Sequence, residues 1–409
     1  MQRLLNHAQK PSDTRYVAVA DGLRAVSIFI VAWFHIWQQS WLTPYIQGKG
    51  FYFSLDPLVR TGYLFVDIML LLSGFLLYLP LARGDAFDVK GFFVRRALRI
   101  LPSYYLSVFL VLFLDALPNG AYGSAASMWQ DLISHLTFTH VFFVNSYNGT
   151  HLNVVLWTLG VEVQFYLLFP LLAGAFRQKP VLTYLGMTAV SFAYRALVMT
   201  GAQDTTLLVN QLAGFLDVYA NGFVCAALYV RWARAERNNL ATRILFSALF
   251  AALIPCFWAM IKRQSAWGTV SYDMLRCGQM ILRYPLSILG CLALFCGANA
   301  GVCVRTLMGG RLMRFLSSIS FQFYIWHQYL AVKLRKWGIP PSVSQTPNFD
   351  GEVTWQYQYT FCAFGLALVA AIVLTYAFER PIARLGARKY QKYQEKRRVQ
   401  EAVKEEIGQ

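Results

Sequence analysis

The chain has 409 residues, of which 57% are hydrophobic and only 14% are charged, and its formal net charge is +17. Its apolar residues cluster in runs of about twenty, the length that a helix needs to cross roughly 30 Å of hydrocarbon. This composition excludes a soluble globular domain and indicates a polytopic membrane protein. No nucleic-acid-binding motif accompanies the positive charge, so we expect membrane lipids and no nucleic acid among the partners.

The predicted fold is all-α, with about ten transmembrane helices. The first apolar run is interpreted as an uncleaved span, because no small-residue cleavage site follows it. In chain order, the expected spans are residues 23–41, 62–82, 98–117, 155–176, 181–200, 207–230, 243–261, 279–299, 314–336 and 357–378.

The distribution of Lys and Arg predicts an N-in, C-in topology. Residues 119–154 contain neither residue type, whereas residues 83–99 contain five such side chains, so the first segment is expected outside and the second in the cytoplasm. The expected domains are a cytoplasmic N-terminal segment (1–16), one membrane domain (17–383) and a basic, helical cytoplasmic tail (384–409).

The first span carries two polar residues on one helix face. Eleven steps separate Arg24 from His35, which places them within about 20° of each other and about 16 Å apart along the axis. Ionisable groups at that depth are costly unless they face protein or water, so the pair predicts a functional site. The alternative for His35 is a core histidine bonded to a backbone carbonyl.

Two further polar residues reach a similar predicted depth. His327 lies about 20 Å from the cytoplasmic edge of its span, and Glu162 about 10 Å below the external edge. A carboxylate beside an imidazole can orient it and stabilise its charged form, so we expect His35 as a general base supported by Glu162. The alternatives are helix packing for His327 and an ion pair with an arginine for Glu162.

Other intramembrane charges have structural interpretations. Arg195 could pair with either Asp67 or Asp217, and we expect the ion pair to form with Asp217. The roles of Asp67 and Asp217 beyond such pairing stay open. Arg96 and Arg99 are three residues apart, so on a helix they share a face and could clamp a phosphate-rich ligand. A plain positive-inside anchor is the alternative. The cysteines have no CxxC pair and no histidine at zinc-ligand spacing, so we expect no metal site.

Five segments in order resemble acyltransferase family 3, the membrane enzymes that O-acylate bacterial cell-surface glycans and lipids. They are ADGLR (20–24) followed by His35, GYLFVDIMLLLSGFLL (62–77), FFVRRALRILP (92–102), LWTLGVEVQFYLLFPLL (156–172) and SSISFQFYIWH (317–327). Thr158 and Phe321 stand where many members have Ser and Tyr. The resemblance covers about residues 17–385.

The resemblance implies a protein integral to the bacterial cytoplasmic membrane that uses acetyl-CoA, or another acyl-CoA, as donor substrate, with no tightly bound cofactor. The family's signature Arg and His fall on Arg24 and His35, its Arg-x-x-Arg motif on Arg96 and Arg99, and its acidic residue on Glu162. The implied function is transfer of an acyl group, acetyl before succinyl, to a hydroxyl of a cell-surface polysaccharide or lipid-linked glycan.

Two questions stay open at this point. Many relatives carry a further extracytoplasmic domain that finishes the transfer, so we expect either direct transfer or hand-over to a separate extracytoplasmic partner. A transporter or flippase of a glycan or lipid precursor could use the same intramembrane charges, although the chain shows no internal repeat. An inactive assembly subunit is a third interpretation. The sequence does not identify the acceptor.

Overall fold

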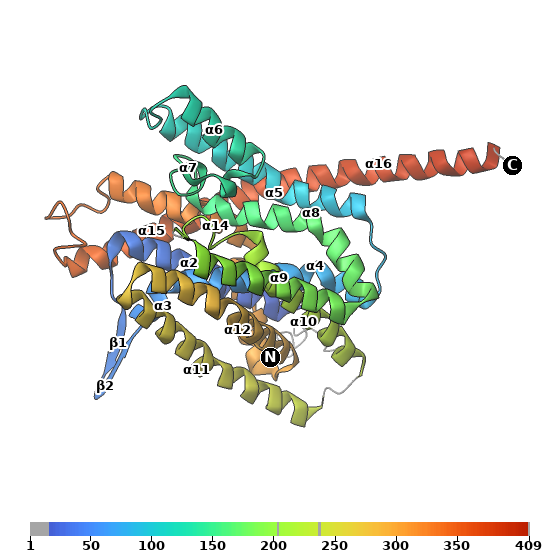
Figure 1. The fold of residues 1–409 in the computed structure, drawn as a ribbon, viewed down its shortest axis with the longest axis horizontal. Coiled ribbons are helices and arrows are strands. Elements are labelled where there is room, and N and C mark those ends of the chain that lie inside the picture. The colour runs from blue at the N-terminus through green and yellow to red at the C-terminus, as the bar shows by residue number, and fades with distance from the viewer. Residues whose placement is uncertain (1–15, 203, 236–238, 408–409) are drawn as a thin grey trace.

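The computed structural model describes residues 16–202, 204–235 and 239–407. In these residues the regular structure is helical, apart from one two-stranded hairpin (Figure 1). The expected N-terminal segment, 1–16, lies outside the described residues except for Tyr16.

The longer helices are α2 (Ala18–Ser40), α4 (Phe65–Arg83), α5 (Val89–Val111), α6 (Ala125–Leu136), α8 (Trp157–Gln178), α9 (Pro180–Gly201), α10 (Leu216–Arg234), α11 (Leu240–Val270), α12 (Tyr272–Asn299), α14 (Arg311–Lys336), α15 (Val353–Leu374) and α16 (Arg380–Ile407). The shorter elements are β1 (Tyr45–Gly48), β2 (Phe51–Ser54), α3 (Asp56–Arg60), η1 (Gly62–Leu64), η2 (Leu112–Ala116), η3 (His140–Phe142), α7 (Val144–Tyr147), η4 (Val154–Leu156), η5 (Leu212–Phe215), α13 (Val302–Gly309) and η6 (Thr375–Glu379).

Within the described residues, nine helices are long and apolar enough to cross a membrane. The protein is therefore an all-α polytopic membrane protein, as predicted. The expected span at 314–336 forms α14, which is not among the nine. Polar side chains such as Ser317, Gln322 and His327 run through it, and these three are buried inside the bundle instead of facing lipid.

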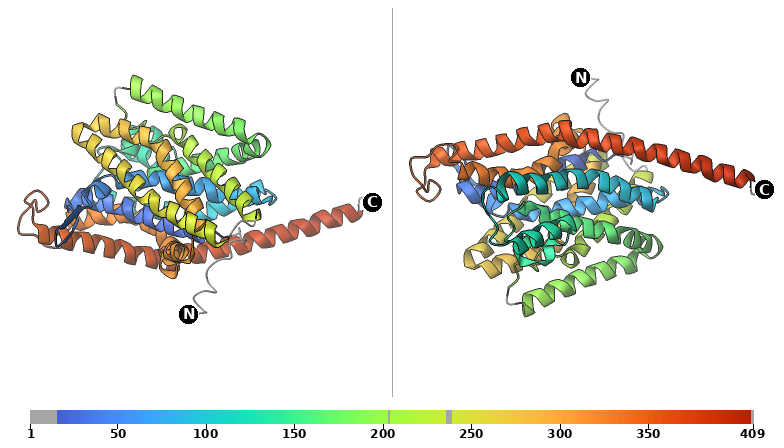
Figure 2. Two further views of the ribbon diagram at one scale, coloured as in Figure 1. Left: turned by 90° about the horizontal axis from the view of Figure 1, so that it is seen from below. Right: turned by 90° about the horizontal axis from the view of Figure 1, so that it is seen from above.

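Several spans differ in length from the sequence prediction. Helix α5 begins at Val89, well before the expected start at 98, because the side chain of Asp88 caps it by accepting a hydrogen bond from the backbone N–H of Gly91 (2.9 Å). At the other end of the chain, α15 continues through the π-helical turn η6 into α16. The predicted helical tail is confirmed as far as Ile407, and Figure 2 shows it extending away from the bundle.

Helix α2 lies in the core, where it packs against α4 and α14. Helix α10 packs on the other side of α4 at a close contact between Gly74 and Gly222, where a Cβ on Gly222 would lie 2.6 Å from the backbone oxygen of Leu71. Small residues at such crossings let helix backbones approach closely. Helices α9 and α11 lie at the edge of the bundle (Figure 2), and most of their residues are not buried.

Two buried ion pairs cross-link the helices. Arg195 of α9 pairs with Asp217 of α10 (Nη2 to Oδ2, 2.5 Å), which confirms the predicted pairing. Arg283 of α12 pairs with Asp67 of α4 (Nε to Oδ1, 3.3 Å), a partnership that the sequence analysis had not identified. Each charge therefore has an opposite charge beside it, as burial requires.

Candidate functional site

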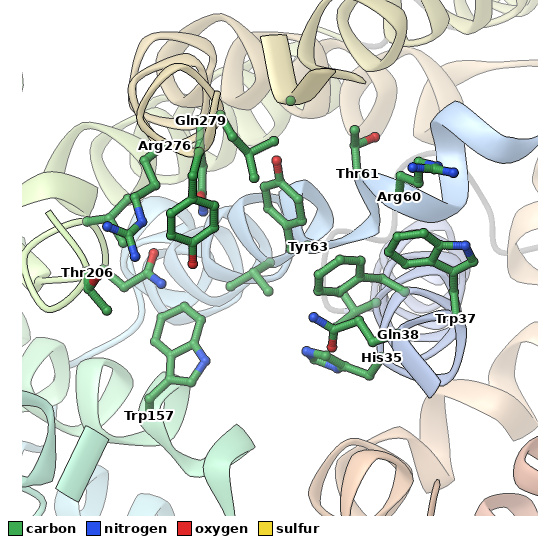
Figure 3. A pocket seen from close by; sticks show the side chains of 18 of the residues that line it. His35, Trp37, Gln38, Arg60, Thr61, Tyr63, Trp157, Thr206, Arg276 and Gln279 are labelled. Atoms are coloured by element: carbon green, nitrogen blue, oxygen red, sulfur yellow. The ribbon is translucent and has the colours of Figure 1, made fainter. Parts of the chain in front are cut away.

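His35 lines a cavity of about 430 Å³, called the His35 cavity below. Figure 3 shows His35 and Gln38 of α2 facing Trp157 of α8 across the open space, with Arg276 of α12 at another side. His35 thus lines a cavity, but the expected arginines Arg24, Arg96 and Arg99 do not line it with His35. Aromatic rings and side-chain amides dominate the rest of the lining: Trp37, Tyr63, Asn148, Tyr147, Asn210, Tyr272 and Gln279.

His327 contacts His35 directly. Nδ1 of His35 lies 2.7 Å from Nε2 of His327, and the ring centroids are 5.0 Å apart with an angle of 30° between the ring planes. His327 is fully buried, and its Nδ1 lies 2.7 Å from the backbone oxygen of Tyr324 and 3.1 Å from that of Phe323. The similar depths estimated from the sequence therefore bring these two histidines together.

Glu162 lies in a different, smaller cavity of about 80 Å³, called the Glu162 cavity, together with Arg24 and Arg99. Its carboxylate accepts hydrogen bonds from Ser73 of α4 (2.9 Å) and from Tyr166, one turn further along α8. The structure thus gives Glu162 hydroxyl partners and gives His35 an imidazole partner. The two expected catalytic groups line neighbouring cavities.

Tyr324 and Val66 form part of the wall that the His35 and Glu162 cavities share, since both residues line both cavities. Tyr324 is buried, and its hydroxyl is held in place by the start of α8. It accepts a hydrogen bond from Thr158 Oγ1 (2.9 Å) and donates one to the backbone oxygen of Val155 (3.3 Å). The hydroxyl of Thr158 thus fixes the orientation of the dividing ring.

A third cavity, of about 260 Å³, adjoins the Glu162 cavity through Arg24, Arg99 and Phe321. We call it the arginine cavity, because it is lined by Arg24 of α2, Arg99 of α5 and Arg314 of α14. Both of its carboxylates accept hydrogen bonds, Asp21 from Ser317, which lines the same cavity, and Glu379 from Gln322. Among the described residues that line this cavity, three guanidinium groups thus outnumber two carboxylates.

Of the three predicted arginines, Arg24 and Arg99 line the arginine cavity and Arg96 does not. The guanidinium of Arg96 lies over the rings of Phe92 (5.9 Å) and Tyr166 (5.7 Å). Arg314 is the residue that the sequence analysis missed. Its position three residues before the motif SSISFQFYIWH was the available signal, but a basic residue at a span end is common.

The three cavities form a series. Shared wall residues link the arginine cavity to the Glu162 cavity, and that cavity to the His35 cavity. An anionic ligand in the arginine cavity and a polar ligand in the His35 cavity would be separated by the small Glu162 cavity. Such an arrangement can hold two substrates at opposite ends of the bundle with a basic nitrogen near one of them.

Comparison with known proteins agrees with this geometry. Residues 17–380 match the model of acyltransferase family 3, described as an acyltransferase domain. A Bacillus subtilis protein named "Putative peptidoglycan O-acetyltransferase YrhL" is 24% identical over 341 residues, covering 78% of this chain and 49% of the relative. An Acidianus two-tailed virus protein named "Putative acetyltransferase ORF330" is 26% identical over 338 residues, which cover 80% of this chain and 86% of the relative.

The peptidoglycan O-acetyltransferase OatA of Listeria monocytogenes is 27% identical over 180 residues, which is 42% of this chain and 25% of OatA. The chain thus spans about half the length of YrhL and a quarter of OatA. No solved structure matches the chain.

Proposed function

The chain belongs to acyltransferase family 3, and we propose that it is a membrane O-acetyltransferase that moves an acetyl group from acetyl-CoA to a hydroxyl of a cell-surface polysaccharide or lipid-linked glycan. The observation that carries the proposal is the series of cavities from three arginines to a basic imidazole. The membrane is the bacterial cytoplasmic membrane. The predicted topology places the arginine cavity at the cytoplasmic end of the series of cavities.

The arginine cavity suits the donor, because CoA carries phosphate groups. Guanidinium groups bind phosphate oxygens with charge-assisted, often bidentate hydrogen bonds. Arg24, Arg99 and Arg314 are the three that can do so from the cavity wall. Arg96 supports the site from outside it, through its contacts with Phe92 and Tyr166.

The chemical step takes place in the His35 cavity. His35 removes the proton from the acceptor hydroxyl as its oxygen attacks the thioester carbonyl. The new C–O bond forms, the C–S bond breaks, and the proton passes from His35 to the departing thiolate of CoA. Glu162 acts in the middle cavity, where it holds Ser73 and Tyr166 in place along the path of the acyl group.

The lining of the His35 cavity suits a sugar. Flat rings such as those of Trp37 and Trp157 offer apolar faces with a polar edge, and side-chain amides both donate and accept hydrogen bonds. A volume of about 430 Å³ is in the usual range for a small-ligand site. The acylated product leaves from this cavity, either as the finished product or as the substrate of a separate extracytoplasmic transferase.

The test uses a strain that lacks the gene, complemented with wild-type protein, His35→Ala or the control Gln39→Ala. Gln39 is the residue after Gln38 on α2 and does not line the three cavities. Mass spectrometry of the surface glycans should show an acetyl increment with wild type and Gln39→Ala, and its loss with His35→Ala at equal protein level. Acetylation retained by His35→Ala would exclude the proposed base.

A further inference from the structure

The hydrogen bonds of His327 fix where its proton lies. Nδ1 of His327 is within hydrogen-bond distance of two backbone carbonyl oxygens, those of Tyr324 (2.7 Å) and Phe323 (3.1 Å). A carbonyl oxygen can only accept a hydrogen bond, so Nδ1 must carry the hydrogen. In a neutral imidazole the other nitrogen, Nε2, then has a free lone pair and can only accept.

The same reasoning extends to His35. Because Nε2 of His327 accepts, Nδ1 of His35 at 2.7 Å must donate, and it therefore carries the hydrogen of the His35 ring. The lone pair of His35 is left on Nε2, which bonds no residue in the described part of the chain. We propose that His327 is a positioning residue that holds His35 in the tautomer whose Nε2 is free to take a proton.

The surroundings hold His327 firmly in this role. Its ring is fully buried and stacks on Phe323, with an interplanar angle of 17°. The backbone of α14 is held at the same level by Asn153, whose amide donates to the oxygen of Ile325 (2.7 Å). A positive charge on this enclosed ring would lack an anionic partner in the described contacts, which favours the neutral form.

The inference rests on the proposed acetyl transfer and assigns a role within it. When Nε2 of His35 takes the proton of the acceptor hydroxyl, the ring becomes positively charged. Its Nδ1–H then donates more strongly to His327, because a charge-assisted hydrogen bond is stronger than a neutral one. The proton then leaves with the CoA thiolate, and His35 returns to its neutral starting tautomer while His327 keeps its own. His327 thus takes the part that a carboxylate has in hydrolase triads.

The test compares His327→Gln with His327→Phe. The amide oxygen of Gln can still accept from Nδ1 of His35, whereas Phe keeps the ring shape and offers no acceptor. Each variant is assayed in membrane vesicles of the gene-deletion strain, which hold the native acceptor, with radiolabelled acetyl-CoA. The neighbouring Gln328→Leu serves as the control, since Gln328 lines a separate cavity with Asp115 and Lys333.

A wrongly placed imidazole tautomer lowers kcat by up to about 10⁴-fold in a serine-protease triad. We therefore expect His327→Phe to lower kcat by about 10²-fold or more while KM for acetyl-CoA changes less than about twofold. His327→Gln should be at least tenfold faster than His327→Phe, and Gln328→Leu should match wild type.

Wild-type kcat in His327→Phe would overturn the inference, and so would equal losses in the Gln and Phe variants, because a packing role does not distinguish an acceptor from a ring. These outcomes leave the proposed function standing as long as His35→Ala is inactive. Activity in His35→Ala would instead remove the proposed base and the positioning role together.

Discussion

Arg314 is the residue whose importance the structure raises most. It lies on the first turn of α14 and lines the arginine cavity together with Arg24 and Arg99. A hydrogen bond to a charged group is worth about 1.5–3 kcal/mol, so Arg314→Ala should raise KM for acetyl-CoA by roughly tenfold to a hundredfold. Initial rates in membrane vesicles at varied acetyl-CoA concentration measure this change.

Arg311 provides the matched control, because it stands one turn earlier on the same helix, is exposed and does not line the cavity. Arg311→Ala should change KM by less than about twofold, since exposed charges contribute little. If both substitutions raise KM equally, the effect comes from general surface charge, and Arg314 has no specific place in donor binding.

For single residues, the sequence predicted positions along one helix well and contacts between residues of different helices poorly. The spacing of Arg24 and His35 follows from helix geometry alone, and both residues line cavities, although not the same one. Whether His35 meets Glu162 or His327 depends on how α2, α8 and α14 pack. That packing is decided by many side chains together and leaves no spacing rule in the sequence.

The crossing of α4 and α10 depends on glycine at its centre. A Cβ on Gly222 would lie 2.6 Å from the oxygen of Leu71 and 2.7 Å from the backbone nitrogen of Phe75, so the helices would have to separate. Overpacking of this kind costs about 1–3 kcal/mol. Gly222→Ala should therefore lower the melting temperature of the purified protein in detergent, followed by tryptophan fluorescence.

Gly186 of α9 has no atom within 4 Å of the position of a Cβ, so Gly186→Ala is the control. Alanine favours the helix by about 1 kcal/mol over glycine, and this variant should melt at the wild-type temperature or above it. A Gly222→Ala protein that melts like wild type would show that the helices can adjust without cost.

Helices were predicted well because a membrane demands a long apolar run. The ends of the helices were predicted less well, because they depend on capping side chains and on whether one helix continues into the next. Asp88 starts α5 early, and the π-helical turn η6 carries α15 on into α16 without a break. Helix α14 is long enough to cross the membrane but is not among the nine apolar spans, because its middle is polar. These polar side chains are buried against other helices.

For the molecule as a whole, Tyr324 stands in the wall between the Glu162 and His35 cavities. Tyr324→Ala would join the Glu162 and His35 cavities and enlarge the space for the acyl group. A missing methylene changes selectivity by about 10- to 200-fold in an apolar pocket. We expect the ratio of butyryl to acetyl transfer to rise by about tenfold or more, measured by competition between the two CoA thioesters.

Tyr329→Ala removes a tyrosine from the same helix that lines a separate cavity with Asp115 and Lys333, and it should leave this ratio unchanged. An unaltered ratio in an active Tyr324→Ala protein would mean that acyl length is selected somewhere other than at this wall. The sequence could not predict the wall, because it needs α4, α8 and α14 to converge on one tyrosine.

The middle cavity, at about 80 Å³, is by far the smallest of the three in the series. If acetyl-CoA is the donor, as proposed, its slim thioester arm suits so small a space better than its adenine nucleotide does. On the proposed function, the spent carrier would then stay on the side where metabolism recharges it, and the cell would export a two-carbon unit without exporting the molecule that delivered it.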